Sequence, residues 1–104
     1  MKTLTELTAE YYALISGDHR KDRDCHFYIQ KIYSYCDKPY WRFLHYGYCS
    51  SVERFFQDEK NIKNYQGCFG KEEFPRRQTM KKAEQDMRNF LEWAIEKEKQ
   101  VKDE

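Results

Sequence analysis

The sequence predicts a single α+β domain in which helices near both ends of the chain pack on one face of a long aromatic β-hairpin. Apolar residues recur at helical spacing near each end of the chain. Between residues 25 and 49 the chain is dense in aromatic and β-branched side chains, which favour strands. The 104 residues fit one domain, residues 1–104, with frayed ends at 1–2 and 99–104.

The composition predicts an aromatic core. The chain has only two Val, five Ile and five Leu, but seven Phe, nine Tyr and two Trp. The formal net charge is +1, so self-repulsion is weak and the chain is expected to fold.

The first predicted helix covers residues 3–16. Thr3 and Glu6 have the spacing of a capping box, and Gly17 can take the left-handed conformation that ends a helix. The apolar residues of this segment share one helical face: Leu4, Leu7, Tyr11, Leu14 and Ile15.

The predicted hairpin joins strands at residues 25–35 and 40–49 through a turn at 36–39. With Asp37 and Lys38 as the central turn residues, Tyr35 is expected opposite Tyr40, and Tyr33 opposite Arg42. Neither face of this hairpin is plainly polar. Because Lys38 precedes a proline, a longer turn with a shifted register stays open.

The remaining elements follow the hairpin. Ser50 and Glu53 form another capping-box pattern, which predicts a short helix at residues 51–60. Residues 64–69 have the composition of a third short strand, and 71–77 of a loop. The last helix is predicted at residues 79–100, with the apolar stripe Met80, Ala83, Met87, Phe90, Leu91, Ala94 and Ile95.

Patterns that signal enzymes and metal sites are missing from the sequence. The four Cys and three His include no C-x2–4-C pair, so we expect free thiols and no metal. No P-loop, glycine-rich nucleotide motif or convergent catalytic set is present. We therefore expect a protein that is not an enzyme and needs no cofactor.

The expected compartment is the cytoplasm. No apolar run reaches the length of a membrane span, and the first residues have no signal-peptide core. Lys and Arg are nearly balanced by Asp and Glu, which removes the global charge argument for a polyanionic partner.

The hairpin is the predicted partner-binding site, because Tyr, Trp and Arg dominate interface energies. Its length exceeds what two modest helices can cover, so some rings should face solvent or a protein partner. An exposed strand edge would also allow a homodimer by edge pairing. The predicted contact residues are Tyr33, Tyr35, Asp37, Lys38, Tyr40, Arg42 and Tyr46.

A nucleic-acid partner is the alternative hypothesis. A helix–strand–strand–strand–helix order with a basic start of the last helix resembles double-stranded-RNA-binding domains. That resemblance implies phosphate contacts from the basic cluster, which comprises Arg76, Arg77, Lys81 and Lys82.

The size and style of the chain also resemble small phage and prophage accessory proteins. The features that carry this resemblance are the helix opening at residues 3–6, the aromatic hairpin and the closing helix at 83–91. The resemblance implies stoichiometric inhibition of a host or bacterial defence protein, as by anti-CRISPR proteins.

Overall fold

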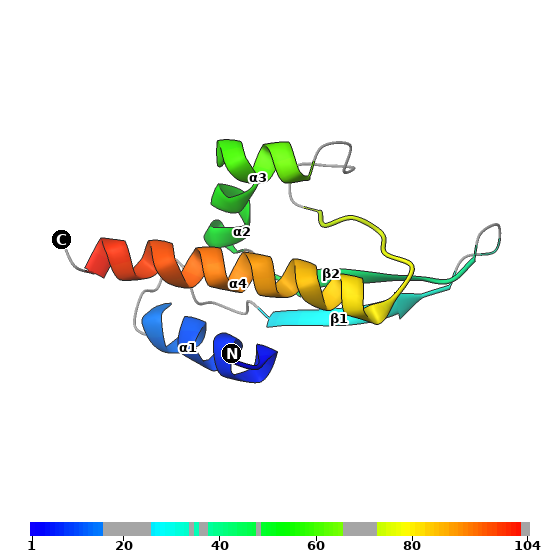
Figure 1. Cartoon of the computed structure of the whole chain (residues 1–104), viewed down its shortest axis with the longest axis horizontal. Helices are drawn as coiled ribbons and strands as arrows, with labels where there is room; N and C mark the ends of the chain where they lie inside the picture. The colour runs from blue at the N-terminus through cyan, green and yellow to red at the C-terminus, as the bar shows by residue number, and fades with distance from the viewer. Residues whose placement is uncertain (16–25, 34, 36–37, 48, 66–72, 103–104) are drawn as a thin grey trace.

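The computed structural model of the chain describes residues 1–15, 26–33, 35, 38–47, 49–65 and 73–102. The elements follow in the order α1 (Leu4–Ile15), β1 (His26–Ile32), β2 (Tyr40–Tyr46), α2 (Ser50–Phe55), α3 (Glu59–Asn64) and α4 (Met80–Lys102). The α+β fold is confirmed. Helix α4 lies across one face of the antiparallel pair β1–β2, and α1 packs beside α4 (Figure 1). The molecule is elongated, with extents of 49 × 28 × 27 Å.

The first helix forms as its sequence predicts. The backbone N–H of Glu6 donates to Thr3 Oγ1 at 3.1 Å, and the N–H of Thr3 donates to Glu6 Oε1 at 3.3 Å. The capping box is therefore present and satisfies N–H groups that have no partner within the helix. The buried side of α1 is formed by Leu7, Tyr11 and Ile15.

The predicted hairpin register is wrong. The pairing runs from His26 opposite Tyr46 to Ile32 opposite Tyr40, and residues 33–39 connect the strands. Pro39 has no N–H to donate to a ladder, so pairing begins only after it, at Tyr40. Tyr40 pairs with Ile32 and not with Tyr35, so the observed register differs from the predicted one by three residues. An odd shift moves every side chain of one strand to the other face. The residues of β1 and β2 that share a face are therefore not those that the predicted pairs imply.

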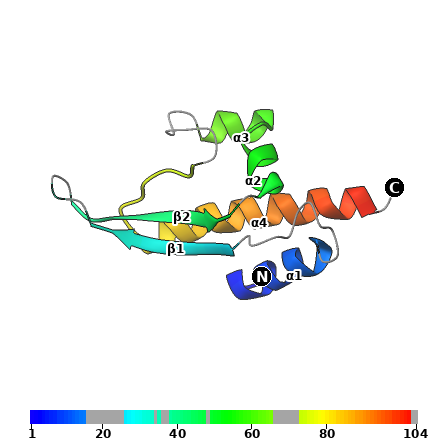
Figure 2. The same cartoon turned by 180° about the vertical axis from the view of Figure 1, so that it is seen from behind.

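The shifted register gives the sheet one covered face and one outer face. Phe27, Ile29 and Phe43 point to the helices and contact the core. We call the opposite side the outer face (Figure 2). The outer face is formed by His26, Tyr28, Gln30, Ile32, Tyr40, Arg42, Leu44 and Tyr46.

The core is aromatic, as the composition predicts. Phe90 of α4 is fully buried at its centre, and its ring centroid lies 5.1–6.1 Å from those of five other rings. These rings come from α1, both strands, α2 and the segment before α4: Tyr11, Phe27, Phe43, Phe55 and Phe74. Pairs of aromatic rings stabilise a fold by more than their buried area alone predicts. They therefore compensate for the small number of Val, Ile and Leu residues.

The prediction of one helix at residues 51–60 is wrong, because the segment forms the two short helices α2 and α3. Cys49, not Ser50, is the N-cap of α2, and no side chain caps it. Asp58 interrupts the segment and caps α3, its side chain accepting the N–H of Lys60 at 3.0 Å.

A third extended segment pairs with β2, but not where the sequence places it. Asn64 belongs to α3, which contradicts a strand beginning there, and residues 66–69 lie outside the described residues. Instead Arg77, in the predicted loop, exchanges two backbone hydrogen bonds of 2.7 Å with Trp41. This pairing fixes the chain before α4 against the free edge of β2.

The last helix is confirmed and extends to Lys102. Thr79 caps it, its hydroxyl accepting the N–H of Lys82 at 3.3 Å. The predicted stripe is buried from Ala83 to Ile95, whereas Met80 is exposed at the first turn.

Candidate partner-binding surface

The outer face leaves tyrosine rings in contact with solvent. Tyr46 is 65% exposed and Tyr28 is 40% exposed. Tyr46 was a predicted contact residue, but Tyr28 was missed, because the predicted register places Tyr28 and Tyr46 on opposite faces of the hairpin. In the observed register, alternate side chains of β1 point to the outer face, and Tyr28 is one of them.

The connection between the strands adds two more exposed rings. Tyr33 is 73% exposed, and Tyr35 is fully exposed, at 109%. Lys38 is exposed as well, whereas the predicted contact Asp37 lies outside the described residues. In the described chain, four of the seven exposed large hydrophobic residues are therefore tyrosines of the hairpin.

Tyr40 and Arg42 are partly buried on the outer face, and a third residue joins them from another segment. The guanidinium carbon of Arg42 lies 5.8 Å from the Tyr40 ring centroid, and that of Arg76 lies 4.7 Å from it. The Arg77–Trp41 pairing brings Arg76 there, because it holds residues 76–77 beside β2. The structure thus joins one residue of the nucleic-acid hypothesis to the hairpin site.

A second cation–aromatic group lies near the connection. Lys31 Nζ lies 5.4 Å from the Tyr33 ring centroid and 5.8 Å from that of Trp41. Lys31 was not among the predicted contacts. The hairpin therefore combines exposed rings with rings that already contact cations of the same chain.

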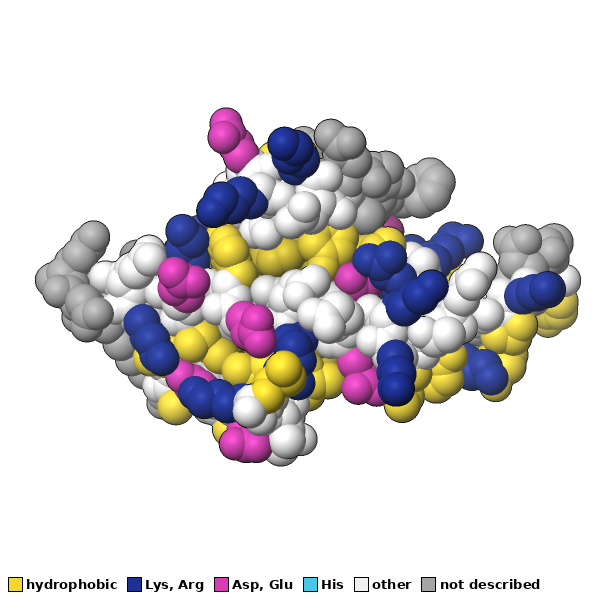
Figure 3. All heavy atoms as spheres, in the orientation of Figure 1, with side chains coloured by type: hydrophobic (Ala, Val, Ile, Leu, Met, Phe, Trp, Pro, Cys, Tyr) yellow, Lys and Arg dark blue, Asp and Glu magenta, His cyan; other side chains and the backbone are white. Residues whose placement is uncertain are grey.

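The hairpin end and the start of α4 carry cations that lack acidic partners in the described chain. These residues are Lys31, Lys38, Arg42, Arg76, Lys81 and Lys82. Other cations form ion pairs: Arg54 contacts Glu98 at 2.9 Å, and Glu10 contacts Lys2 and, at 3.0 Å, Lys99. These two lysines hold the pKa of Glu10 below its ordinary value. In Figure 3, Lys and Arg side chains lie over both halves of the molecule. Lys60, Lys63 and Lys97 also lack acidic partners in the described chain, so the hairpin end is one of several places with such cations.

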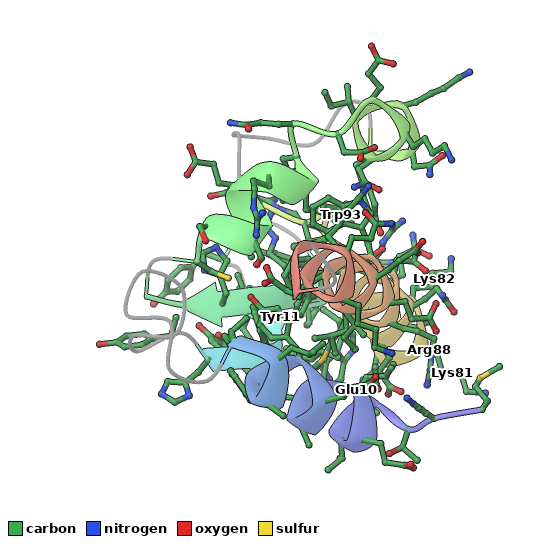
Figure 4. The ribbon with its side chains drawn as sticks, turned by 90° about the vertical axis from the view of Figure 1, so that its left-hand side faces the viewer. Glu10, Tyr11, Lys81, Lys82, Arg88 and Trp93 are labelled. Carbon is green, nitrogen blue, oxygen red and sulfur yellow. The ribbon has the colours of Figure 1, made fainter. Side chains whose placement is uncertain are left out.

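The predicted basic cluster is divided by the fold. Arg77, which is partly exposed, forms an ion pair with the buried Asp86, donating from Nε to Oδ2 at 2.7 Å and from Nη2 to Oδ1 at 2.8 Å. Lys81 and Lys82 lie on the side of α4 away from the strands (Figure 4), whereas Arg76 contacts Tyr40. Arg77 thus ties its segment to α4, and it lines one pocket together with Lys82.

A polar network surrounds the Arg77–Asp86 pair. The Tyr65 hydroxyl donates to Asp86 Oδ1 at 3.1 Å and accepts from Asn89 Nδ2 at 3.3 Å. Burial is the main cause that raises the pKa of Tyr65 to about 12. The network lines a pocket between α3 and α4 together with Lys82 and Gln85, and its groups are engaged with one another.

The cysteine and histidine positions offer no metal site in the described part of the chain. There is no group of three or more His, Cys, Asp or Glu side chains placed to hold an ion among those residues. Cys49 is buried, and its Sγ lies 3.6 Å from the Tyr11 hydroxyl, whereas His26 pairs with Tyr46 on the neighbouring strand. The other three cysteines lie outside the described residues.

Comparisons with other proteins add no family to this description. No protein-family model, curated protein or solved structure matches the chain. In the described residues, no helix is both long enough and apolar enough to cross a membrane.

Proposed function

We propose that the chain is a small non-enzymatic binding protein that docks on a protein partner through its β-hairpin. The resemblance to phage accessory proteins extends this proposal to inhibition: the bound hairpin covers a working surface of a host or defence protein. The exposure of Tyr28, Tyr33, Tyr35 and Tyr46 carries the proposal.

The energetics of protein interfaces support it. Tyr presents a large rigid ring at a low cost in side-chain entropy, and Tyr and Arg are enriched among the residues that dominate binding. Four solvent-facing rings on one short hairpin have no role in the core, which Phe90 and its neighbours fill. Exposed rings of this density are typical of interaction surfaces.

Affinity capture with matched variants tests the proposal. The chain is immobilised and incubated with a bacterial lysate, and the proteins retained are compared between wild type, Tyr28→Ser/Tyr46→Ser and Lys60→Gln/Lys63→Gln. The two lysines are exposed on α3, outside the hairpin, so the second variant controls for non-specific surface changes. We expect one protein at stoichiometric amount with wild type and with the lysine variant, and its loss with the tyrosine variant.

Circular dichroism and thermal unfolding accompany the capture. Tyr28 and Tyr46 are exposed, so their substitution should leave the fold intact. If every retained protein is captured equally by a folded tyrosine variant, the hairpin is not the docking surface and the proposal fails.

A further inference from the structure

The hairpin carries a charge feature that exposed tyrosines alone do not explain. Two guanidinium groups, those of Arg42 and Arg76, flank the ring of Tyr40 at 5.8 and 4.7 Å. Neither has a carboxylate partner in the described chain, and Arg42 Nε is buried there with no hydrogen-bond acceptor. A buried donor without an acceptor weakens the isolated fold, so the hydrogen-bonding capacity of the Arg42 guanidinium is not fully used within the described chain.

Cation–aromatic contact with Tyr40 restrains both arginines. A planar guanidinium held against a ring loses less side-chain entropy when it binds, and its fork matches a carboxylate with two parallel hydrogen bonds. Lys31, which contacts the ring of Trp41, and the exposed Lys38, two residues before Tyr40, add positive charge to the same hairpin. We infer that Arg42, Tyr40 and Arg76 form a carboxylate-binding site, and that the protein partner presents Asp or Glu side chains to it. This inference rests on the proposed function and names the chemistry of the partner.

A protein carboxylate fits these observations better than a nucleic acid. Single-stranded nucleic acids bind by stacking bases on free aromatic faces, but at this site the Tyr40 ring is already contacted by two arginines. Lys81 and Lys82 lie on the side of α4 away from the strands, so they do not extend the site into a track for a phosphate backbone. The net charge of +1 also lacks the excess of cations that drives counterion release.

The test uses a short oligo-glutamate peptide as the probe. Binding is followed by amide chemical shifts of the isotopically labelled chain at physiological salt. We expect saturable shifts at β2 and at residues 76–77, and a dissociation constant about tenfold weaker in Arg42→Gln/Arg76→Gln. Lys60→Gln/Lys63→Gln loses the same charge from exposed lysines of α3 and should bind the peptide as wild type does, within about twofold.

Three results overturn the inference. In the first, the peptide produces no saturable shifts at β2. In the second, the arginine and lysine variants weaken binding equally, so that net charge alone matters. In the third, oligo-uridine RNA of equal length binds at β2 more tightly than oligo-glutamate, which assigns the site to nucleic acid.

Capture of the partner separates this inference from the proposed function. If Arg42→Gln/Arg76→Gln retains the captured protein while Tyr28→Ser/Tyr46→Ser loses it, the hairpin docks on a partner that is not acidic. The proposed function then stands and the inference fails. If both variants lose the partner and the lysine variant keeps it, the two are supported together.

Discussion

The buried carboxylate of Asp86 accepts three hydrogen bonds, two of them from its ion-pair partner Arg77. Arg77 supplies two of them, at 2.7 and 2.8 Å, and the Tyr65 hydroxyl the third, at 3.1 Å. Asp86 is 2% exposed. The pair joins α4 to the segment that pairs with Trp41, so it also positions Arg76 over Tyr40.

Replacing Asp86 by Ala is expected to lower the free energy of unfolding by about 3 kcal/mol, because it removes the buried carboxylate that accepts two hydrogen bonds from Arg77 and one from Tyr65. Urea unfolding measures the loss. The control is Glu92→Ala, which removes an exposed contact of 3.6 Å with Arg88 and should cost less than about 0.5 kcal/mol. Equal losses in the two variants would contradict a structural role for the Arg77–Asp86 pair.

Tyr11→Phe is expected to cost about 1 kcal/mol of stability. The Tyr11 hydroxyl is fully buried and donates to Ser51 Oγ at 2.8 Å, which links α1 to α2 (Figure 4 shows Tyr11 between α1 and the rest of the core). Tyr46→Phe removes a hydroxyl from an exposed ring and should leave stability unchanged. Thermal unfolding of both variants makes the comparison, and an equal melting temperature for Tyr11→Phe and wild type would refute the prediction.

The elements with local signals were predictable from the sequence. The Thr3–Glu6 capping box is set by a spacing of three residues, and the α4 stripe by helical periodicity, so neither depends on distant parts of the chain. The aromatic core followed from the supply of side chains. The hairpin followed from its composition, but its register did not, because that depends on the conformation of residues 33–39.

The part of the site that joins two segments was not predictable. Arg76 and Tyr40 are far apart in the sequence and meet only because Arg77 pairs with Trp41. That pairing falls in a stretch whose proline indicated a loop. Arg76 and Arg77 look equivalent in the sequence, yet Arg76 contacts Tyr40 and Arg77 pairs with the buried Asp86. Such a division depends on the tertiary packing of α4 against β2.

Phe90→Ala is expected to destabilise the fold by about 3–5 kcal/mol, because it removes the ring that five others contact. Phe90→Leu keeps most of the volume and should cost less, about 1–2 kcal/mol. Tyr33→Ala, at an exposed ring, should stay within about 0.5 kcal/mol of wild type. Urea unfolding of the three variants gives this order, and a loss for Tyr33→Ala as large as that for Phe90→Ala would place Tyr33 in the core.

Tyr65 makes the stability of the fold sensitive to alkaline pH. Burial raises its pKa from 10.0 to about 12. The unfolded chain therefore loses the Tyr65 proton first, and the folded state keeps it until about pH 12. The contribution of Tyr65 to stability is fully present below about pH 10 and is lost as the pH rises towards 12.

The comparison of wild type with Tyr65→Phe isolates this effect from the other tyrosines. Near neutral pH the variant should be less stable, because it lacks the hydrogen bond to Asp86. Between about pH 10 and 12 the difference should shrink, since only the unfolded wild type gains stability by ionising Tyr65. Urea unfolding over this range measures the difference, and the absorbance change on phenolate formation in the folded protein should show one late-titrating tyrosine that the variant lacks. A difference in stability that stays constant with pH would show that Tyr65 ionises equally in the folded and unfolded chains.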